Sequence, residues 1–247
     1  MTNTAEYVQS ASARISALGS AFYFVPETLA VGKEHGLDGL RFYVLGRGGV
    51  LGDVEPPVIS SAFGYFTPAL IEHVWTSAKE RADLSPRECG RLYLECAADF
   101  GRRQFADVPE LQAFCDAAQK IHEATDVAGL ALYAGYVAEP LAQDLPGRAM
   151  QLVTILREFM GSAHLVAVLA VGLEPKVAHG VRRPEMWESF GYGDEPAPAD
   201  TEEARALLAD ADALTQRLIT PAYGVLSAGE RDALQTGLDA LTAAAAA

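Results

Sequence analysis

Cysteine is scarce in this chain, and its three cysteines are poorly placed for a disulfide framework. Cys89, Cys96 and Cys115 form no C-x-x-C pair, and an odd number cannot all pair within one chain. Cys89 and Cys96 lie seven residues apart and would share one face of a helix, as core residues do. We therefore expect buried free thiols, which are typical of a reducing compartment.

Basic residues are also few. Lysine and arginine together number 19 against 33 acidic residues, which gives a formal net charge of −14. A surface of this sign repels the phosphate backbone, from which proteins draw much of their affinity for nucleic acids. The balance therefore disfavours nucleic acid as a partner, unless a local basic patch opposes the overall field.

Long apolar runs are missing. The most apolar segments, LVAVLAVGL and GLALYAGYVAEPLA, fall short of the roughly 18 residues that span a bilayer. The N-terminal segment MTNTAEYVQSASARISAL is polar and lacks the basic-then-apolar pattern of a secretory signal peptide. We therefore expect a cytoplasmic protein with no membrane partner.

The familiar metal, nucleotide and hydrolase motifs are absent as well. The five histidines include no H-E-x-x-H pair, so we predict no metal site, although one histidine would suffice as an axial haem ligand. The glycine-rich GRGGVLG at 46–52 does not match G-x-G-x-x-G, but a turn of this kind with Arg47 could hold one anion. There is also no G-x-S-x-G element. The sequence identifies no cofactor.

Helical periodicity, by contrast, runs through most of the chain. Half of the residues are hydrophobic, and Ser85-x-x-Glu88 and Ser227-x-x-Glu230 are capping-box patterns. The aromatic and β-branched segment LRFYVLG predicts one small strand piece near 41–45. We therefore predict an all-α, multi-helix bundle, with a degenerate helix-turn-helix or winged-helix-like element as a further option.

The composition divides the chain into three parts. Residues 1–182 are predicted to form the main helical domain, and 183–200 an exposed acidic loop rich in proline and glycine. Residues 201–247 are predicted to form two helices that pack on the main domain or on a partner. Because such a pair cannot bury its apolar face alone, we expect a homodimer.

One stretch, REFMGSAHLVAVLAVGL, sets three ionisable groups beside an apolar segment. We predict a helix that ends at Gly161 and a new helix capped by Ser162, which places His164 in a first turn, where the helix dipole favours a bound anion. Arg157 and Glu158 would then meet His164 at the junction. Two interpretations remain open: a buried network that fixes the angle between the helices, or the polar end wall of an apolar pocket.

Three segments carry a resemblance to a known family. YFVPETLAVGKEHGLDGLRFYVLGRGGVLGDV, FGYFTPALIEHVW and ILREFMGSAHLVAVLAVGLEPKVAHGV are similar to an actinobacterial family described as SalK-like or helix-turn-helix, over about residues 22–180. The resemblance places Arg47 and Gly52 on the family's R-x-x-PLG loop. On the family's LREHRGDGH motif it places four residues: Arg157, Glu158, Gly161 and His164.

The chain departs from that family in two places. Phe159 and Met160 replace the His-Arg of the family motif, and Ser162 replaces its Asp, which makes this segment less basic. Relatives continue into a winged segment with a GW-x-x-x-x-W signature, where this chain has the short, acidic RRPEMWESFGYGDEPAPAD. The part best suited to contact DNA is therefore the part that differs.

The preferred hypothesis is a helical protein that binds, or acts as an enzyme on, an apolar or aromatic small molecule. Aromatic residues concentrate on segments that also carry glycine, which leaves room for a flat ligand. If the protein is an enzyme, we expect His164 to be the acid–base residue and Glu158 to orient it. The predicted ligand-binding residues are Arg157, His164, Glu158, Arg47, Tyr43 and Phe66.

The alternative hypothesis is a ligand-responsive helix-turn-helix regulator that binds DNA as a dimer. HLVAVLAVGLEPKVAHGV places a glycine between two short helices, as that motif requires. The second helix would offer Lys176, with Arg182 and Arg183 at its end. However, it is mostly apolar, and a reading helix should present several side chains to bases or phosphates.

Overall fold

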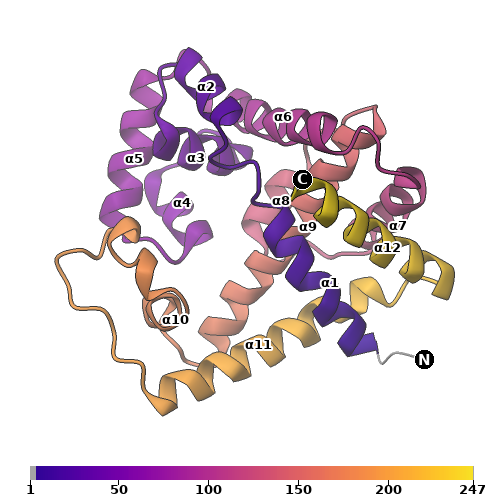
Figure 1. Ribbon diagram of the computed structural model, residues 1–247. Coiled ribbons are helices and arrows are strands. Elements are labelled where there is room, and N and C mark those ends of the chain that lie inside the picture. Colours follow the sequence, from indigo (N-terminus) through magenta and orange to yellow (C-terminus); the bar gives the residue numbers. More distant parts are fainter. Residues whose placement is uncertain (1–3, 247) are drawn as a thin grey trace.

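The computed structural model describes residues 4–246, and within that range it holds α-helices and three short 3-10 helices but no strand (Figure 1). The all-α prediction is confirmed. The α-helices are α1 (Thr4–Leu18), α2 (Pro26–Glu34), α3 (Gly39–Gly48), α4 (Pro56–Phe63), α5 (Pro68–Arg81), α6 (Pro86–Gln104), α7 (Leu111–Glu123), α8 (Ala131–Val137), α9 (Leu145–Ala170), α10 (Pro175–Arg182), α11 (Glu202–Tyr223) and α12 (Ala228–Ala245). The 3-10 helices are η1 (Gly49–Leu51), η2 (Pro184–Met186) and η3 (Glu188–Phe190).

The predicted strand near 41–45 is wrong, because these residues lie in α3. Asp38 caps this helix by accepting a hydrogen bond from the backbone N–H of Arg41 at 3.0 Å. The four residues 42–45 are all buried. A short continuous apolar run fits a buried helix as well as a strand, so its β-branched and aromatic character misled the prediction.

The glycines in the last turn of α3 and in η1 allow close packing. A Cβ atom at Gly46 would lie 2.6 Å from the ring of Tyr93, and one at Gly49 would lie 1.9 Å from the carbonyl oxygen of Pro86. Both contacts are with α6, so these glycines let α3 and η1 approach that helix closely. Gly52 has a φ of +84°, a conformation that favours glycine.

Helix α9 is continuous, which corrects a second prediction. Gly161 does not end a helix, and Ser162 does not begin one, because both lie inside α9. His164 is consequently far from a helix N-terminus, so the helix dipole does not favour a bound anion beside it. A glycine is only a modest cost inside a helix, and the packing of α9 against α6, α11 and α7 outweighs that cost.

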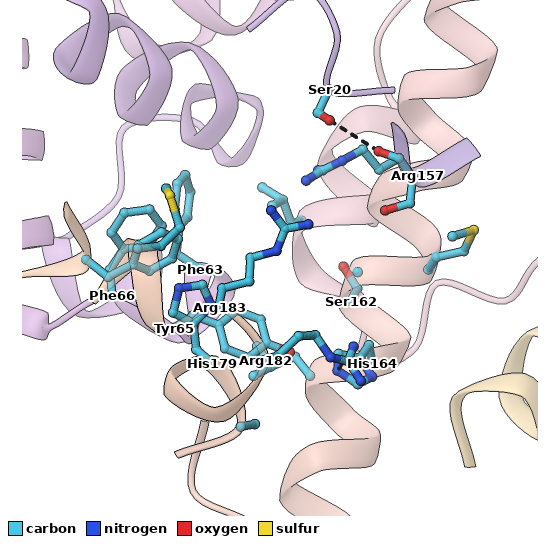
Figure 2. A pocket seen from close by; sticks show the side chains of 18 of the residues that line it. Ser20, Phe63, Tyr65, Phe66, Arg157, Ser162, His164, His179, Arg182 and Arg183 are labelled. Atoms are coloured by element: carbon cyan, nitrogen blue, oxygen red, sulfur yellow. Dashed lines mark hydrogen bonds between the residues drawn. The ribbon is translucent and has the colours of Figure 1, made fainter. Parts of the chain in front are cut away.

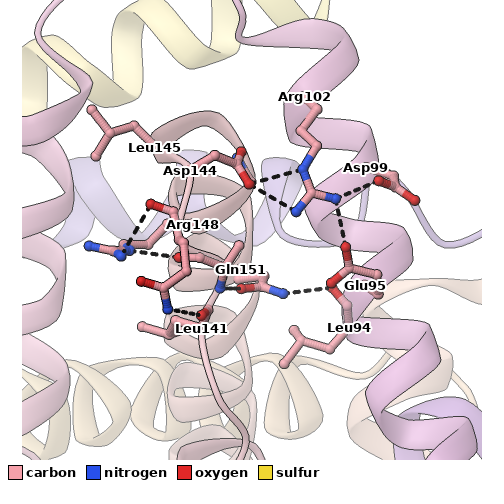
Figure 3. Close-up of polar contacts among 12 residues, drawn as sticks. Leu94, Glu95, Asp99, Arg102, Leu141, Asp144, Leu145, Arg148 and Gln151 are labelled. Atoms are coloured by element: carbon pink, nitrogen blue, oxygen red, sulfur yellow. Dashed lines mark hydrogen bonds and ion pairs between the residues drawn. The ribbon is translucent and has the colours of Figure 1, made fainter.

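Helix α9 runs through the middle of the molecule, with α6 on one side and α11 on another (Figure 1). By length and composition alone it could cross a membrane, and 56% of its most apolar window is buried inside the fold, as in the core helix of a soluble domain. At its N-terminal end, Asp144 accepts hydrogen bonds from Gly147 and from Arg102 of α6 (Figure 3). Buried Gln151 donates to the carbonyl of Leu94. These bonds fix α9 to α6.

The C-terminal helices pack on the rest of the chain. Helix α11 lies along α9, and α12 contacts α7 and α1. A Cβ atom at Gly237 of α12 would lie 2.6 Å from the ring of Phe114, and Lys120 lies 2.7 Å from Glu230. The capping boxes at Ser85 and Ser227 are both confirmed. The homodimer remains a prediction.

Residues 183–200 are only partly an exposed loop. They contain η2 and η3, and Trp187 and Tyr192 are buried with their rings stacked at 4.3 Å. The indole N–H of Trp187 donates to the carbonyl of Glu195 at 2.8 Å. These contacts order the segment internally, and Phe190 joins it to the rest of the protein by stacking on Phe66 and accepting a backbone hydrogen bond from Thr67.

A substitution at Gly161 tests the continuity of α9. No atom lies within 4 Å of a Cβ added there, so Gly161→Ala should stabilise the helix by about 0.5–1 kcal/mol. The melting temperature should rise by roughly 1–4 °C for a chain of this size. The matched control is Gly101→Ala in α6, whose Cβ would lie 2.3 Å from the carbonyl oxygen of Pro146 and should destabilise the protein. A lower melting temperature for Gly161→Ala would show that the helix ends at this glycine.

Candidate functional site

A cavity of about 1040 Å³ lies between the α3–α4 region, the middle of α9, the α10–η3 segment and α11 (Figure 2). Five of the six predicted ligand-binding residues line it, and the sixth, Glu158, lies buried behind its wall. Its aromatic lining comes from four separate parts of the chain: Tyr23, Phe24, Tyr43, Phe63, Tyr65, Phe66 and Phe190.

Glu158 is the centre of a buried ionic network. It is 1% exposed, and Arg47 donates two hydrogen bonds to its carboxylate, from Nε to Oε1 at 2.9 Å and from Nη2 to Oε2 at 2.8 Å. Arg157 Nη1 donates to Oε1 at 2.9 Å, and the hydroxyl of Tyr23 donates to the same oxygen at 3.0 Å. The network joins α3, α9 and the segment after α1.

The arginines keep this carboxylate ionised. Burial alone would raise the pKa of Glu158, but the guanidinium groups of Arg47 and Arg157 lower it by more, so the pKa lies below its ordinary value. Two cations and one anion share the network, which leaves one positive charge in excess. The sequence placed Arg157 beside Glu158, but Arg47 lies 111 residues away in the chain and only the fold brings it here.

His164 belongs to a different network. Its Nδ1 lies 3.0 Å from the hydroxyl oxygen of Thr215, and that hydroxyl donates its own hydrogen to the carbonyl of Ala211 at 2.7 Å. Nδ1 must therefore carry the hydrogen that Thr215 accepts. Nε2 is then the acceptor, and Nη1 of Arg182 lies 3.4 Å from it. Arg182 also makes two 2.6 Å hydrogen bonds to Asp212.

The structure does not assemble the predicted acid–base pair. The oxygens of Glu158 are bonded to Arg47, Arg157 and Tyr23, whereas His164 is bonded to Thr215. Burial lowers the pKa of His164, the charge of Arg182 lowers it further, and Asp212 opposes the shift only in part. The imidazole is therefore neutral at pH 7. The predicted junction of Arg157, Glu158 and His164 is in fact two networks on one continuous helix.

The predicted DNA-binding residues do not form one outward row. Lys176 lies 3.6 Å from Glu195, Arg182 is paired with Asp212, and both Arg182 and Arg183 line the cavity (Figure 2). The turn before α10 does contain Gly172 with a φ of +77°. Helices α9 and α10 therefore have the connectivity of a helix-turn-helix. Two of the three basic residues predicted to contact DNA, Arg182 and Arg183, line the cavity instead.

The sequence analysis missed several residues of the cavity. The ring of Phe190 stacks on Phe66 and on His179, each with ring centroids 3.9 Å apart, and closes one side of the cavity. Four polar atoms of the cavity lining are buried without a hydrogen-bond partner among the described residues: Tyr65 Oη, His179 Nε2, Gln216 Oε1 and Arg157 Nε. The sequence had singled out Arg157, but no pattern marks the other residues, because distant segments bring them together.

The described residues offer little for metal or thiol chemistry. No group of three or more His, Cys, Asp or Glu side chains within 4–246 is placed to hold a metal ion. The cysteines are free and buried, as expected. Burial raises the pKa of Cys89 and Cys115 to about 11 and that of Cys96 to about 12, so all three are protonated thiols at pH 7.

Neutralising Glu158 should be severely destabilising. In Glu158→Gln, Arg47 and Arg157 keep their charges but lose the carboxylate that compensates them, which typically costs about 3–5 kcal/mol. Chemical denaturation measures this loss. The control Glu95→Gln removes one exposed partner of Arg102 and should change the free energy of unfolding by at most about 1 kcal/mol. Equal effects of the two substitutions would show that the buried network contributes little.

The hydrogen-bond assignment of His164 predicts its behaviour with pH. Nitrogen NMR should show a neutral ring with the hydrogen on Nδ1 at pH 7, and a pKa below 6.5. Because folding lowers the pKa, the unfolded chain takes up a proton first as pH falls below about 6.5, so stability decreases in that range. His164→Asn should reduce this pH dependence. A charged ring at pH 7 would contradict the assignment.

Comparison with known proteins identifies a family for this chain. The sequence profile of a family described as the Helix-turn-helix family matches residues 8–247, a range that includes every element around the cavity. No curated protein and no solved structure matches the chain. The finer resemblance to SalK-like proteins of actinobacteria stays a prediction. Since the match covers nearly all of the sequence, the chain belongs to the Helix-turn-helix family.

Proposed function

We propose that this family member is a small-molecule-binding protein whose cavity takes a ligand with an apolar or aromatic body. The observation that carries the proposal is the cavity itself, in which seven aromatic side chains and four arginines surround about 1040 Å³. Known ligand pockets hold about 300–1,000 Å³ and combine an apolar lining with a few polar groups that orient the ligand. The volume of this cavity is slightly above the upper end of that range.

The unpartnered polar atoms support the same function. Buried polar groups in folded proteins nearly always have a hydrogen-bond partner, and an unpaired group typically costs about 1–3 kcal/mol. Of nine such atoms among the described residues, four, from α4–α5, α9, α10 and α11, lie on the lining of this one cavity. A ligand with oxygen or nitrogen atoms would supply their partners.

The residues favour binding over catalysis. His164, the expected acid–base residue, is neutral and contacts Thr215 and Arg182 with its two nitrogens. The three cysteines are protonated thiols, and none of them lines the cavity. Glu158 is held by its arginines, so it is not free to take up a proton. No side chain of the cavity lining is thus set up as a nucleophile with an adjacent base.

Filling the cavity tests the proposal. Ser162 lines it from α9, so Ser162→Trp should occupy the space while leaving the helix intact. Fluorescence titration with the neutral probe N-phenyl-1-naphthylamine should show binding to the unmodified protein. The affinity of Ser162→Trp for the probe should be at least roughly tenfold weaker, which corresponds to a loss of about 1.4 kcal/mol.

The matched control is Leu169→Trp, also on α9. Leu169 is 59% exposed and does not line the cavity, so this variant should bind the probe as the unmodified protein does. Unchanged binding by Ser162→Trp, with both variants folded by circular dichroism, would place the probe outside the cavity and remove the proposal's support.

A second candidate is a ligand-responsive regulator that binds DNA as a dimer. The family description and the α9–turn–α10 connectivity favour it. Against it, Ala178 and Gly180 of α10 are buried in the protein, Arg182 is paired with Asp212, and the net charge is −14. A reading helix needs several side chains free to reach bases or phosphates. The cavity therefore carries the primary proposal.

Selection from a random DNA pool distinguishes the two candidates. At about 0.15 M salt we expect no enriched sequence and only weak, salt-sensitive binding. The regulator would be favoured by nanomolar binding to one selected sequence that Lys176→Ala weakens. Lys79→Ala is the control, since that lysine lies on α5, far along the chain from the α9–turn–α10 element, where it pairs with Asp53.

A further inference from the structure

The cavity is electropositive within an acidic protein. Four guanidinium groups line it, from Arg47, Arg157, Arg182 and Arg183, and Asp212 is the one carboxylate of the lining. With Glu158 directly behind the wall, four positive charges face two negative ones. His164 and His179 add none at pH 7, because burial lowers the pKa of both. The excess of two positive charges stands against a net charge of −14 for the whole chain.

Asp212 and Glu158 do not occupy all the hydrogen-bond donors of the four arginines. Asp212 is occupied by Arg182 through two short hydrogen bonds, and Glu158 accepts two from Arg47. Arg157 donates hydrogen bonds to Tyr23 and Glu158 through Nη1 alone. Its Nε is buried and has no hydrogen-bond partner among the described residues. Arg183 makes no hydrogen bond or ion pair with any residue of the described range 4–246, apart from the backbone bonds of its own segment.

These two arginines approach the cavity from different sides. Figure 2 shows Arg157 reaching in from α9 and Arg183 from the end of α10. Guanidinium groups are strong, directional donors to carboxylate and phosphate oxygens. The aromatic wall lies beside them, with Arg47 placed 4.7 Å from the ring centroid of Phe63.

We propose that the ligand is an aromatic or apolar acid whose anionic group lies between Arg157 and Arg183, with its ring system against Phe63 and Tyr65. The proposal rests on the small-molecule-binding function and names the class of ligand. It also assigns Arg183, which the sequence placed on a DNA-binding surface, to the cavity. The anion would join α9 to the end of α10, so the ligand would tie the segment 183–200 to the body of the protein.

The proposal has a matched pair of probes. 8-Anilinonaphthalene-1-sulfonate and N-phenyl-1-naphthylamine share one aromatic skeleton and differ by the sulfonate, which stands in for the carboxylate or phosphate of the ligand. The unmodified protein should bind the sulfonate at least about tenfold more tightly than the neutral probe, as expected for a charge-assisted hydrogen bond. The preference should shrink as salt is raised.

Arg183→Gln should remove most of that preference while leaving the affinity for the neutral probe within about twofold. Arg217→Gln is the matched control, because Arg217 is exposed on α11 and does not line the cavity. Arg157→Gln is the second variant and should have the same effect. Melting temperatures verify that each variant is folded before it is titrated, since the sulfonate probe also binds loosened proteins.

The outcomes separate this inference from the function on which it rests. If both probes bind with equal affinity and Arg183→Gln changes neither, the cavity binds arenes but the anionic class is wrong. If neither probe binds, the small-molecule function itself fails, and this inference fails with it. If Arg217→Gln weakens the sulfonate as much as Arg183→Gln does, the preference comes from general surface charge, and the assignment to Arg183 is overturned.

Discussion

The buried carboxylate of Glu158 is the constraint on which the rest of the site depends. It is almost fully buried, and its oxygens accept four hydrogen bonds from Arg47, Arg157 and Tyr23. Removing such an ion pair from water costs several kcal/mol, so it is weak evidence for net stabilisation. What it does provide is position, because it fixes two long arginine side chains at the wall of a cavity.

This arrangement explains how an acidic protein can present a positive site. The 33 acidic residues are mostly on the surface, where water screens them, whereas the cavity gathers four arginines. Arg47 and Arg157 are partly buried there, and Arg182 and Arg183 are exposed at its edge. Fields in a cleft with low-dielectric walls are stronger than on an open surface. The family description emphasises a helix-turn-helix, yet the most distinctive chemistry of this chain lies where α10 meets the cavity.

The sequence predicted local features better than distant contacts. Helical periodicity and both capping boxes depend on nearby residues, and they were correct. The strand near 41–45 was wrong because a fully buried helix shows no alternation, and the break at Gly161 was wrong because tertiary packing outweighs one glycine. The contact of Arg47 with Glu158 and the stacking of Phe190 on Phe66 join segments more than 100 residues apart, and no local pattern reports them.

The coupling between Arg47 and Glu158 tests this account most directly. A double-mutant cycle with Arg47→Gln, Glu158→Gln and the combined variant, followed by chemical denaturation, isolates the energy of the pair from the other effects of each substitution. The account predicts a coupling free energy above about 1.5 kcal/mol, with the combined variant more stable than the sum of the single losses implies. Additive losses, within about 0.5 kcal/mol, would show that the two residues do not depend on each other and would contradict it.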